Sequence, residues 1–141
     1  MTLSVRRWLL LFLAAISVYV GAWALFAPAS WWASFPGFGL HWLPVLGVYN
    51  EHLARDVGAL YLALAALSAG AAARPRDDYL VRLTAAVWLV FSIPHLIYHV
   101  LHLDHYTGLD RAGNVVSLGF FVLAGVMLLF SVPRSQTPSA G

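Results

Sequence analysis

Four long apolar stretches, separated by short polar segments, dominate the pattern of the chain. Each is long enough to cross a hydrocarbon core of roughly 30 Å, which takes about 20 helical residues. Helices are expected, because an open strand would leave backbone groups without hydrogen bonds in lipid. The pattern predicts an all-α fold, an integral membrane four-helix bundle in one domain over residues 1–132, with helices at about 8–27, 52–73, 79–103 and 114–132. The polar tail, residues 133–141, is predicted to be disordered.

The composition agrees with a membrane protein and excludes several kinds of chemistry. The 141 residues are 61% hydrophobic and 10% charged, whereas a soluble domain carries roughly 25% charged residues. The net charge of +2 is too small to indicate a nucleic-acid partner. The chain has no cysteine, which excludes disulfides, thiol catalysis, iron–sulfur ligation and covalent c-type haem attachment.

The placement of arginine predicts how the helices are oriented. With four crossings, six of the eight arginines share one side, namely Arg6, Arg7, Arg74, Arg76, Arg82 and Arg134. Only Arg55 and Arg111 lie on the other side. The positive-inside rule then places both termini in the cytoplasm of a multi-pass plasma-membrane protein. The first apolar run is longer than a signal-peptide core of about 7–15 residues, so we expect it to be retained as a helix.

The opposite side of the predicted bundle carries a long connection rich in aromatic residues, about residues 28–51. Such rings suit a membrane–water interface. A short interfacial helix or a re-entrant lid is conceivable within SFPGFGLHWLP, and we expect a loop that lies on the bundle.

Titratable groups collect on this same side, at the start of the second helix and the end of the third. Glu51 and Arg55 are four residues apart, as are His52 and Asp56, so each pair can meet on a helix surface. In the third helix, His95, His99 and His102 fall at helical spacing, with Tyr98 adjacent. A charge inside an apolar span is costly and is expected to face the bundle interior and be paired.

These residues define one candidate site with four interpretations. The ligand or metal candidates are His52, Asp56, His95, His99, His102 and Glu51, supported by Arg55, Asn50, Tyr98 and Asn114. They could bind a divalent metal, hold haem b between histidines of two helices, or form a metal-free binding or catalytic site. Alternatively, they form a structural network that ties helix ends together. Asn114 and Ser117 are also expected to cap and pack the start of the fourth helix.

Several segments resemble a known group of proteins. They are FPGFG (35–39), YNEHLARDVGALYLAL (49–64), AVWLVFSIPHLIYHVLHLD (86–104) and Asn114. In these segments the chain is similar to small, functionally uncharacterised four-helix membrane proteins of actinobacteria, and more distantly to DoxX-like membrane proteins. The chain lacks the cysteines of thiol-linked DoxX relatives. The resemblance implies the four-helix architecture and no particular activity.

Three functions follow as hypotheses, and the sequence leaves open whether the protein is an enzyme. The first is an outward-facing metal or haem site for redox or hydrolytic chemistry. The second is a binding module for a small lipophilic ligand, and the third is an accessory or structural subunit of a homo-oligomer or membrane complex. Membrane lipids are expected partners in each case.

Overall fold

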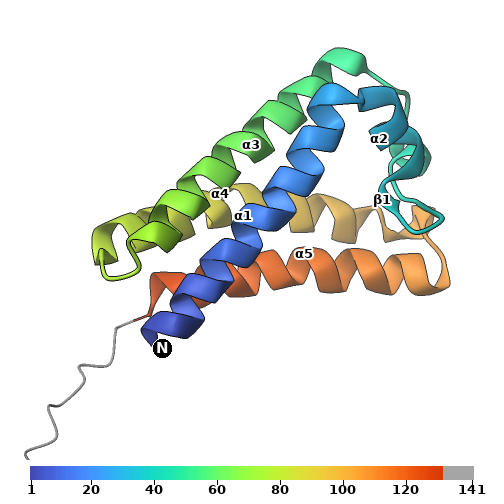
Figure 1. The fold of residues 1–141 in the computed structure, drawn as a ribbon. Coiled ribbons are helices and arrows are strands. Elements are labelled where there is room, and N and C mark those ends of the chain that lie inside the picture. The colour runs from blue at the N-terminus through green and yellow to red at the C-terminus, as the bar shows by residue number, and fades with distance from the viewer. Residues whose placement is uncertain (132–141) are drawn as a thin grey trace, which may run out of the picture.

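The protein is helical, as the apolar pattern predicts. The computed structural model describes residues 1–131 (Figure 1). Its elements are α1 (Leu3–Phe26), α2 (Pro28–Ser34), β1 (Pro36–Gly37), β2 (Leu40–His41), η1 (Pro44–Leu46), α3 (Glu51–Ala73), α4 (Asp78–Leu101), η2 (Leu103–His105) and α5 (Gly108–Leu129). Four of them, α1, α3, α4 and α5, are long and apolar enough to cross a membrane. The predicted disordered tail and Arg134 lie outside the described residues.

Two helix boundaries differ clearly from the hydropathy pattern, because polar residues belong to the helix ends. α1 begins at Leu3, where the Thr2 hydroxyl accepts a hydrogen bond from Val5 N at 3.3 Å. α5 begins at Gly108 rather than near residue 114, and Asp110 lies in its first turn. A carboxylate there is stabilised by the positive end of the helix dipole. The prediction that Asn114 caps this helix is therefore wrong, since Asn114 lies inside it.

The four long helices form two antiparallel pairs. α1 packs along α3, and α4 packs along α5, with far fewer contacts between the pairs. Figure 1 shows that the pairs meet near the N-terminus and diverge toward α2 and β1. We call the closed end, which holds the 74–77 connection and the end of α5, the apex. We call the open end, which holds residues 28–50 and 102–107, the mouth.

A buried arginine closes the apex. Arg6 is 1% exposed. Its guanidinium donates to Asp78 Oδ1 at 2.6 Å, to the Pro75 carbonyl at 2.9 Å and to the Ser131 carbonyl at 2.6 Å. It also donates to the Ser131 hydroxyl at 2.7 Å and 3.0 Å. One side chain thus joins α1, the 74–77 connection, α4 and the segment after α5, a role that the sequence did not reveal.

Trp88 fills the core between the helix pairs. It is fully buried, and its indole donates to Ser68 Oγ of α3 at 2.9 Å. Its ring stacks on Phe121 of α5 with centroids 5.3 Å apart. The hydrogen bond satisfies the one polar atom of the indole in an apolar setting. We call the space between the two helix pairs the wedge. Its half nearer the apex is therefore filled by packed side chains.

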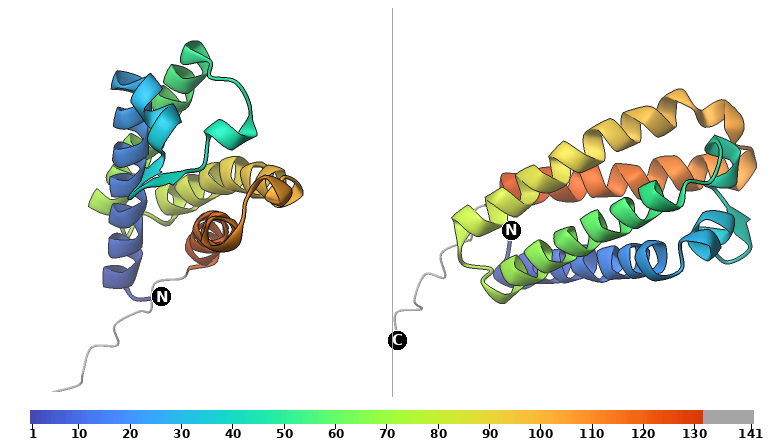
Figure 2. Two further views of the ribbon diagram at one scale, coloured as in Figure 1. Left: turned by 90° about the vertical axis from the view of Figure 1, so that its right-hand side faces the viewer. Right: turned by 90° about the horizontal axis from the view of Figure 1, so that it is seen from above.

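Residues 28–49, here called the strap, lie across the mouth, where a loop on the bundle was expected, but residues 28–34 form the helix α2, which was not predicted from the sequence. The left view of Figure 2 looks onto this end and shows the segment after α2 crossing between the helix pairs. Two central residues of its β-hairpin, Phe38 and Gly39, have φ values of 58° and 80°. A two-residue hairpin turn with positive φ at both positions matches the right-handed strand twist.

The strap is fastened to both helix pairs. On the α1 side, Tyr19 donates to the Pro36 carbonyl at 3.0 Å, and Trp23 donates to Ser30 Oγ at 3.1 Å. On the α5 side, Trp42 is the anchor: its indole donates to Asp110 Oδ1 at 2.9 Å, and its carbonyl accepts from Tyr106 Oη at 2.9 Å. The strap therefore bridges the open end of the wedge.

Candidate functional site

A cavity of about 460 Å³ lies in the wedge beneath the strap. Ligand-binding cavities commonly measure about 300–1,000 Å³. All five α-helices and the strap contribute to its wall. The lining residues are Ile16, Tyr19, Val20, Trp31, Phe35, Pro36, Phe38, Trp42, Leu43, Leu46, Val57, Tyr61, His95, Tyr98, His99, Asn114, Ser117, Leu118 and Phe121.

The wall of the cavity is aromatic and uncharged. No Asp, Glu, Lys or Arg is among the described residues that line it. Trp31 and Phe35 of the strap are in contact at 5.7 Å between ring centroids, and Phe35 meets Trp42 edge-on at 6.2 Å. A cavity of this kind accepts a neutral, largely apolar molecule, because a buried charge without a partner is strongly disfavoured.

Several polar side chains of the wall have no hydrogen-bond partner within residues 1–131, and of these the Trp31 indole nitrogen is enclosed, whereas Tyr61 and His95 border the cavity. Tyr61 is 7% exposed, yet its hydroxyl meets no donor or acceptor of the described chain. The imidazole of His95 likewise forms no hydrogen bond there, although its ring stacks on Phe91 at 5.2 Å. Buried polar groups are nearly always paired in proteins. Tyr61 and His95 are therefore the groups in this wall best placed to meet a polar atom of a ligand.

His99 forms the boundary between the cavity and the α4–α5 connection. It is 7% exposed, and its ring lies 4.8 Å from that of His95 and 6.3 Å from that of Tyr106. The Asn114 side chain interacts with it from α5. Asn114 itself is buried, and its amide donates to the Asp110 carbonyl at 3.0 Å. His99 Nδ1 is enclosed and has no partner among the described residues.

The structure divides the predicted histidine stripe. His95 and His99 line the cavity, whereas His102 does not. α4 ends at Leu101, and His102 is its C-cap. There, His102 Nδ1 lies 2.7 Å from the Tyr98 carbonyl, and its ring stacks on Tyr98 at 4.2 Å. The helical spacing fails because the helix ends before its third histidine.

The polar residues that open α3 form a separate group on the surface. Arg55 bonds Glu51 Oε1 at 2.8 Å and donates to the Leu25 carbonyl at 2.5 Å, which ties the start of α3 to the end of α1. His52 and Asp56 pair at 3.3 Å, with side chains 85% and 60% exposed. These four residues do not line the cavity. Asn50 caps α3 by accepting from Leu53 N at 3.1 Å. The two predicted i,i+4 pairs are present, and they act as surface contacts.

The described residues do not show the ligand sets predicted for a metal ion or a haem. Within residues 1–131, no group of three or more His, Asp or Glu side chains is placed to hold one ion. The haem interpretation predicted one axial histidine from each of two helices. His95 and His99 share one helix, and His52 lies on the surface with Asp56. The predicted convergence of His52 and Asp56 with the α4 histidines therefore does not occur.

Several cavity residues escaped sequence reasoning. Tyr61 is a lone hydroxyl in the middle of an apolar span, and polar groups inside spans are a recognised signal of function. The aromatic composition of residues 28–51 indicates a membrane interface, and only the fold shows that the strap turns Trp31, Phe35 and Trp42 inward. Phe121 and Leu118 carry no signal that separates a cavity wall from an ordinary core.

Comparisons with protein-family models, curated proteins and solved structures give no match to this chain. The similarity to actinobacterial and DoxX-like membrane proteins therefore stays a prediction. The class that the fold defines is a helical protein with four helices long and apolar enough to cross a membrane.

Proposed function

We propose that this protein is a multi-pass membrane protein that binds a small, uncharged lipophilic molecule in the cavity beneath the strap. The observation that carries the proposal is the cavity itself, walled by every α-helix and free of charged side chains. The small-ligand interpretation of the candidate site is kept, but the site lies in the wedge and not at the polar cluster that begins α3.

The ligand is expected to combine an apolar body with one hydrogen-bonding group. The aromatic wall suits a flat or ring-containing body. Tyr61 and His95 offer a hydroxyl and an imidazole without partners in the described chain. A site built to hydrogen-bond discriminates strongly against analogues that lack the polar atom. A hydrocarbon of the same shape should therefore bind more weakly than a phenol, amine or carbonyl compound.

The orientation proposed for the chain places the mouth outside and the apex in the cytoplasm. Support comes from the arginines: Arg6, Arg7, Arg74 and Arg76 all lie at the apex, as the positive-inside rule requires of the cytoplasmic side. Binding is favoured over transport, because Trp88, Leu13 and Leu128 are fully buried between the cavity and the apex.

The test uses 1-aminoanthracene, a neutral fluorescent aromatic amine, with the detergent-purified full chain. Native mass spectrometry should show one molecule bound per chain. Ser117→Phe on α5 and Val57→Phe on α3 each place a ring in the cavity from opposite walls and should abolish binding. Val116→Phe is the matched control, because Val116 precedes Ser117 and is 71% exposed.

Circular dichroism of each variant shows whether it is folded. Loss of binding in both filled variants, with binding retained in Val116→Phe, supports the proposal. Equal binding in all three folded variants would place the probe in the micelle or on the surface and would overturn it.

A further inference from the structure

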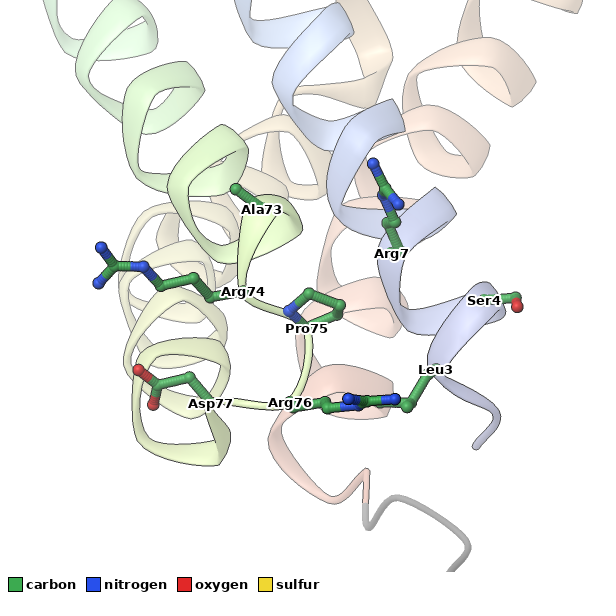
Figure 3. Close-up of a pocket in the computed structure, with 8 residues that line it drawn as sticks. All are labelled: Leu3, Ser4, Arg7, Ala73, Arg74, Pro75, Arg76 and Asp77. Atoms are coloured by element: carbon green, nitrogen blue, oxygen red, sulfur yellow. The ribbon is translucent and has the colours of Figure 1, made fainter. Parts of the chain in front are cut away.

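A second hollow, of about 650 Å³, lies at the apex, at the end of the molecule opposite the strap. Figure 3 shows its lining, which comes from the first turns of α1 and from the connection between α3 and α4. The lining residues are Leu3, Ser4, Arg7, Ala73, Arg74, Pro75, Arg76 and Asp77.

The hollow carries excess positive charge that the described chain does not neutralise. Three arginines and one carboxylate line it, and that carboxylate, Asp77, accepts a hydrogen bond from Leu80 N at 3.0 Å as the cap of α4. Within residues 1–131, Arg7, Arg74 and Arg76 form no ion pair or side-chain hydrogen bond. Arg6, the neighbour of Arg7, is fully engaged in the interior. Adjacent arginines thus have different roles, one structural and one available to a ligand.

Two of the arginines, Arg7 of α1 and Arg76 of the connection, line the same hollow from two sides, and their long side chains can rotate toward a ligand between them. Figure 3 shows Arg76 extending from the connection toward Leu3 of α1, whereas the Arg7 side chain begins on the next turn of α1 and extends away from Arg76. Arg74 extends in the opposite direction, away from them. A guanidinium presents a planar fork of donors that matches phosphate oxygens.

The N-terminal turn of α1 adds to the positive electrostatic potential of the hollow. Leu3 and Ser4 line the hollow and are the first residues of this 24-residue helix. The first N–H groups of a helix lack helical acceptors, and the helix dipole is positive at this end. A phosphate beside Arg7 and Arg76 would therefore also meet the favourable end of α1.

The residues around this hollow are of the kinds found at the depth of lipid headgroups. Trp8 and Tyr79, next to Arg7 and Asp78 in the sequence, are 70% and 77% exposed. Exposed Trp and Tyr at the ends of spanning helices typically lie at the membrane–water interface. A soluble anion would not need such neighbours, whereas a lipid phosphate lies at this level.

We propose that Arg7, Arg76 and the start of α1 form a binding site for the phosphate of an anionic phospholipid headgroup. The proposal requires that the apex lies at a membrane surface, as in the orientation above, and is independent of what the cavity binds. Basic pockets between spanning helices are a recurrent way to hold such headgroups.

The test measures phosphatidylglycerol bound to the delipidated full chain by native mass spectrometry, with phosphatidylcholine as the neutral reference. Arg7→Gln and Arg76→Gln should each weaken phosphatidylglycerol binding roughly fivefold, the factor that corresponds to about 1 kcal/mol per arginine near a membrane. Arg82→Gln removes the same charge from an exposed position of α4 outside the hollow and should leave binding within about twofold.

Three results would overturn the proposal. An equal loss in Arg82→Gln would show diffuse attraction, and equal binding of phosphatidylcholine would remove the role of charge. Displacement of phosphatidylglycerol by millimolar inorganic phosphate would assign the site to a free anion. Arg7→Lys keeps the charge and should retain most of the binding. This result would show that the loss in Arg7→Gln comes from the lost charge and not from misfolding. Binding of 1-aminoanthracene should be unchanged in Arg7→Gln, so the two proposals fail separately.

Discussion

Gly58 of α3 and Gly21 of α1 bring the backbones of their helices into direct contact. A Cβ on Gly58 would lie 2.5 Å from Leu25 N and 2.9 Å from the Gly21 carbonyl. A Cβ on Gly21 would lie 2.9 Å from the Gly58 carbonyl. Small residues allow such close approach where lipid removes the hydrophobic drive for helix association.

Gly58→Ala should therefore destabilise the α1–α3 pair. The methyl group would meet backbone atoms that cannot rotate away, so we expect a loss near the upper end of the roughly 1–3 kcal/mol typical of overpacking. Unfolding by sodium dodecyl sulfate in mixed micelles measures the change. Gly70→Ala in the same helix is the control, because a Cβ there meets nothing within 4 Å. That variant should gain about 0.5–1 kcal/mol from reduced backbone freedom.

Arg6→Gln should weaken the apex. Its loss leaves the Ser131 and Pro75 carbonyls without their donor, while Asp78, whose side chain is 46% exposed, can be rehydrated. We expect roughly 2–3 kcal/mol of destabilisation, the range for losing hydrogen bonds from a charged group. Arg82→Gln should stay within about 0.5 kcal/mol under the same detergent titration. Similar midpoints for the two variants would contradict the role assigned to Arg6.

The strap should loosen at alkaline pH through Tyr106. Burial, with smaller effects of Tyr98 and Asp110, raises the pKa of Tyr106 from its ordinary value of 10.0 to about 12. Because the folded-state pKa is the higher one, the stabilisation by Tyr106 is complete below pH 10 and is lost as the pH rises from 10 to about 12. Ionisation removes the proton that Tyr106 donates to the Trp42 carbonyl.

Hydrogen exchange of the strap at a series of pH values, corrected for the intrinsic rate, measures this effect. Protection of residues 40–46 should fall above pH 10 in the wild-type protein. In Tyr106→Phe, protection should be lower at neutral pH and lack this alkaline step. The chain has no lysine, so side-chain titration in this range comes from tyrosines. An alkaline step of equal size in the variant would exclude Tyr106 as its source.

Tyr61→Phe should separate ligand binding from stability. Since the Tyr61 hydroxyl has no partner in the described chain, its removal costs no internal hydrogen bond and should leave stability unchanged or raise it by up to about 1 kcal/mol. Binding of 1-aminoanthracene should weaken severalfold. Trp88→Phe is the contrasting variant, because it breaks the bond to Ser68 and should lower stability. A Tyr61→Phe protein that binds as tightly as wild type would remove Tyr61 from the site.

The cluster at the start of α3 should prove energetically minor. His52→Ala and Asp56→Asn disrupt an exposed pair, and such pairs contribute about 0–1 kcal/mol. Neither change should alter probe binding or metal content, and a chelator should not shift the unfolding midpoint. Stoichiometric metal in chelator-free protein that disappears in His52→Ala would restore the metal interpretation.

The apolar pattern was sufficient to predict the four long helices, because crossing a bilayer constrains length and composition together. It did not predict the short helix α2. It could not predict which helices pair. That choice depends on local fits such as Gly21 against Gly58, and on Arg6, whose partners lie far along the chain. An arginine near the start of a predicted span indicates the orientation of the helix, but the sequence does not show whether its side chain is exposed or buried.

The candidate site was predicted only in part, for a related reason. Spacing placed His95 and His99 on one face of α4, and the structure puts both in the cavity wall. Equal depth along the bundle suggested that His52 and Asp56 would join them. Depth does not determine the direction in which a side chain faces, and α3 turns these two residues outward. The strap supplies the aromatic wall, and its path depends on turn geometry rather than on hydropathy.

The wedge, fixed at one end by Arg6, also has a mechanical consequence. A helix of the length of α4, with 24 residues, forms a lever of roughly 36 Å at 1.5 Å per residue. Rotation of one helix pair by about 3° around the apex would move its far end by roughly 2 Å. The hydrogen bonds of Trp42 and Tyr106 oppose that movement where the leverage is greatest. If the proposed lipid phosphate binds at the apex, it would restrict this rotation. The lipid composition at the apex would then affect how far the cavity beneath the strap can widen.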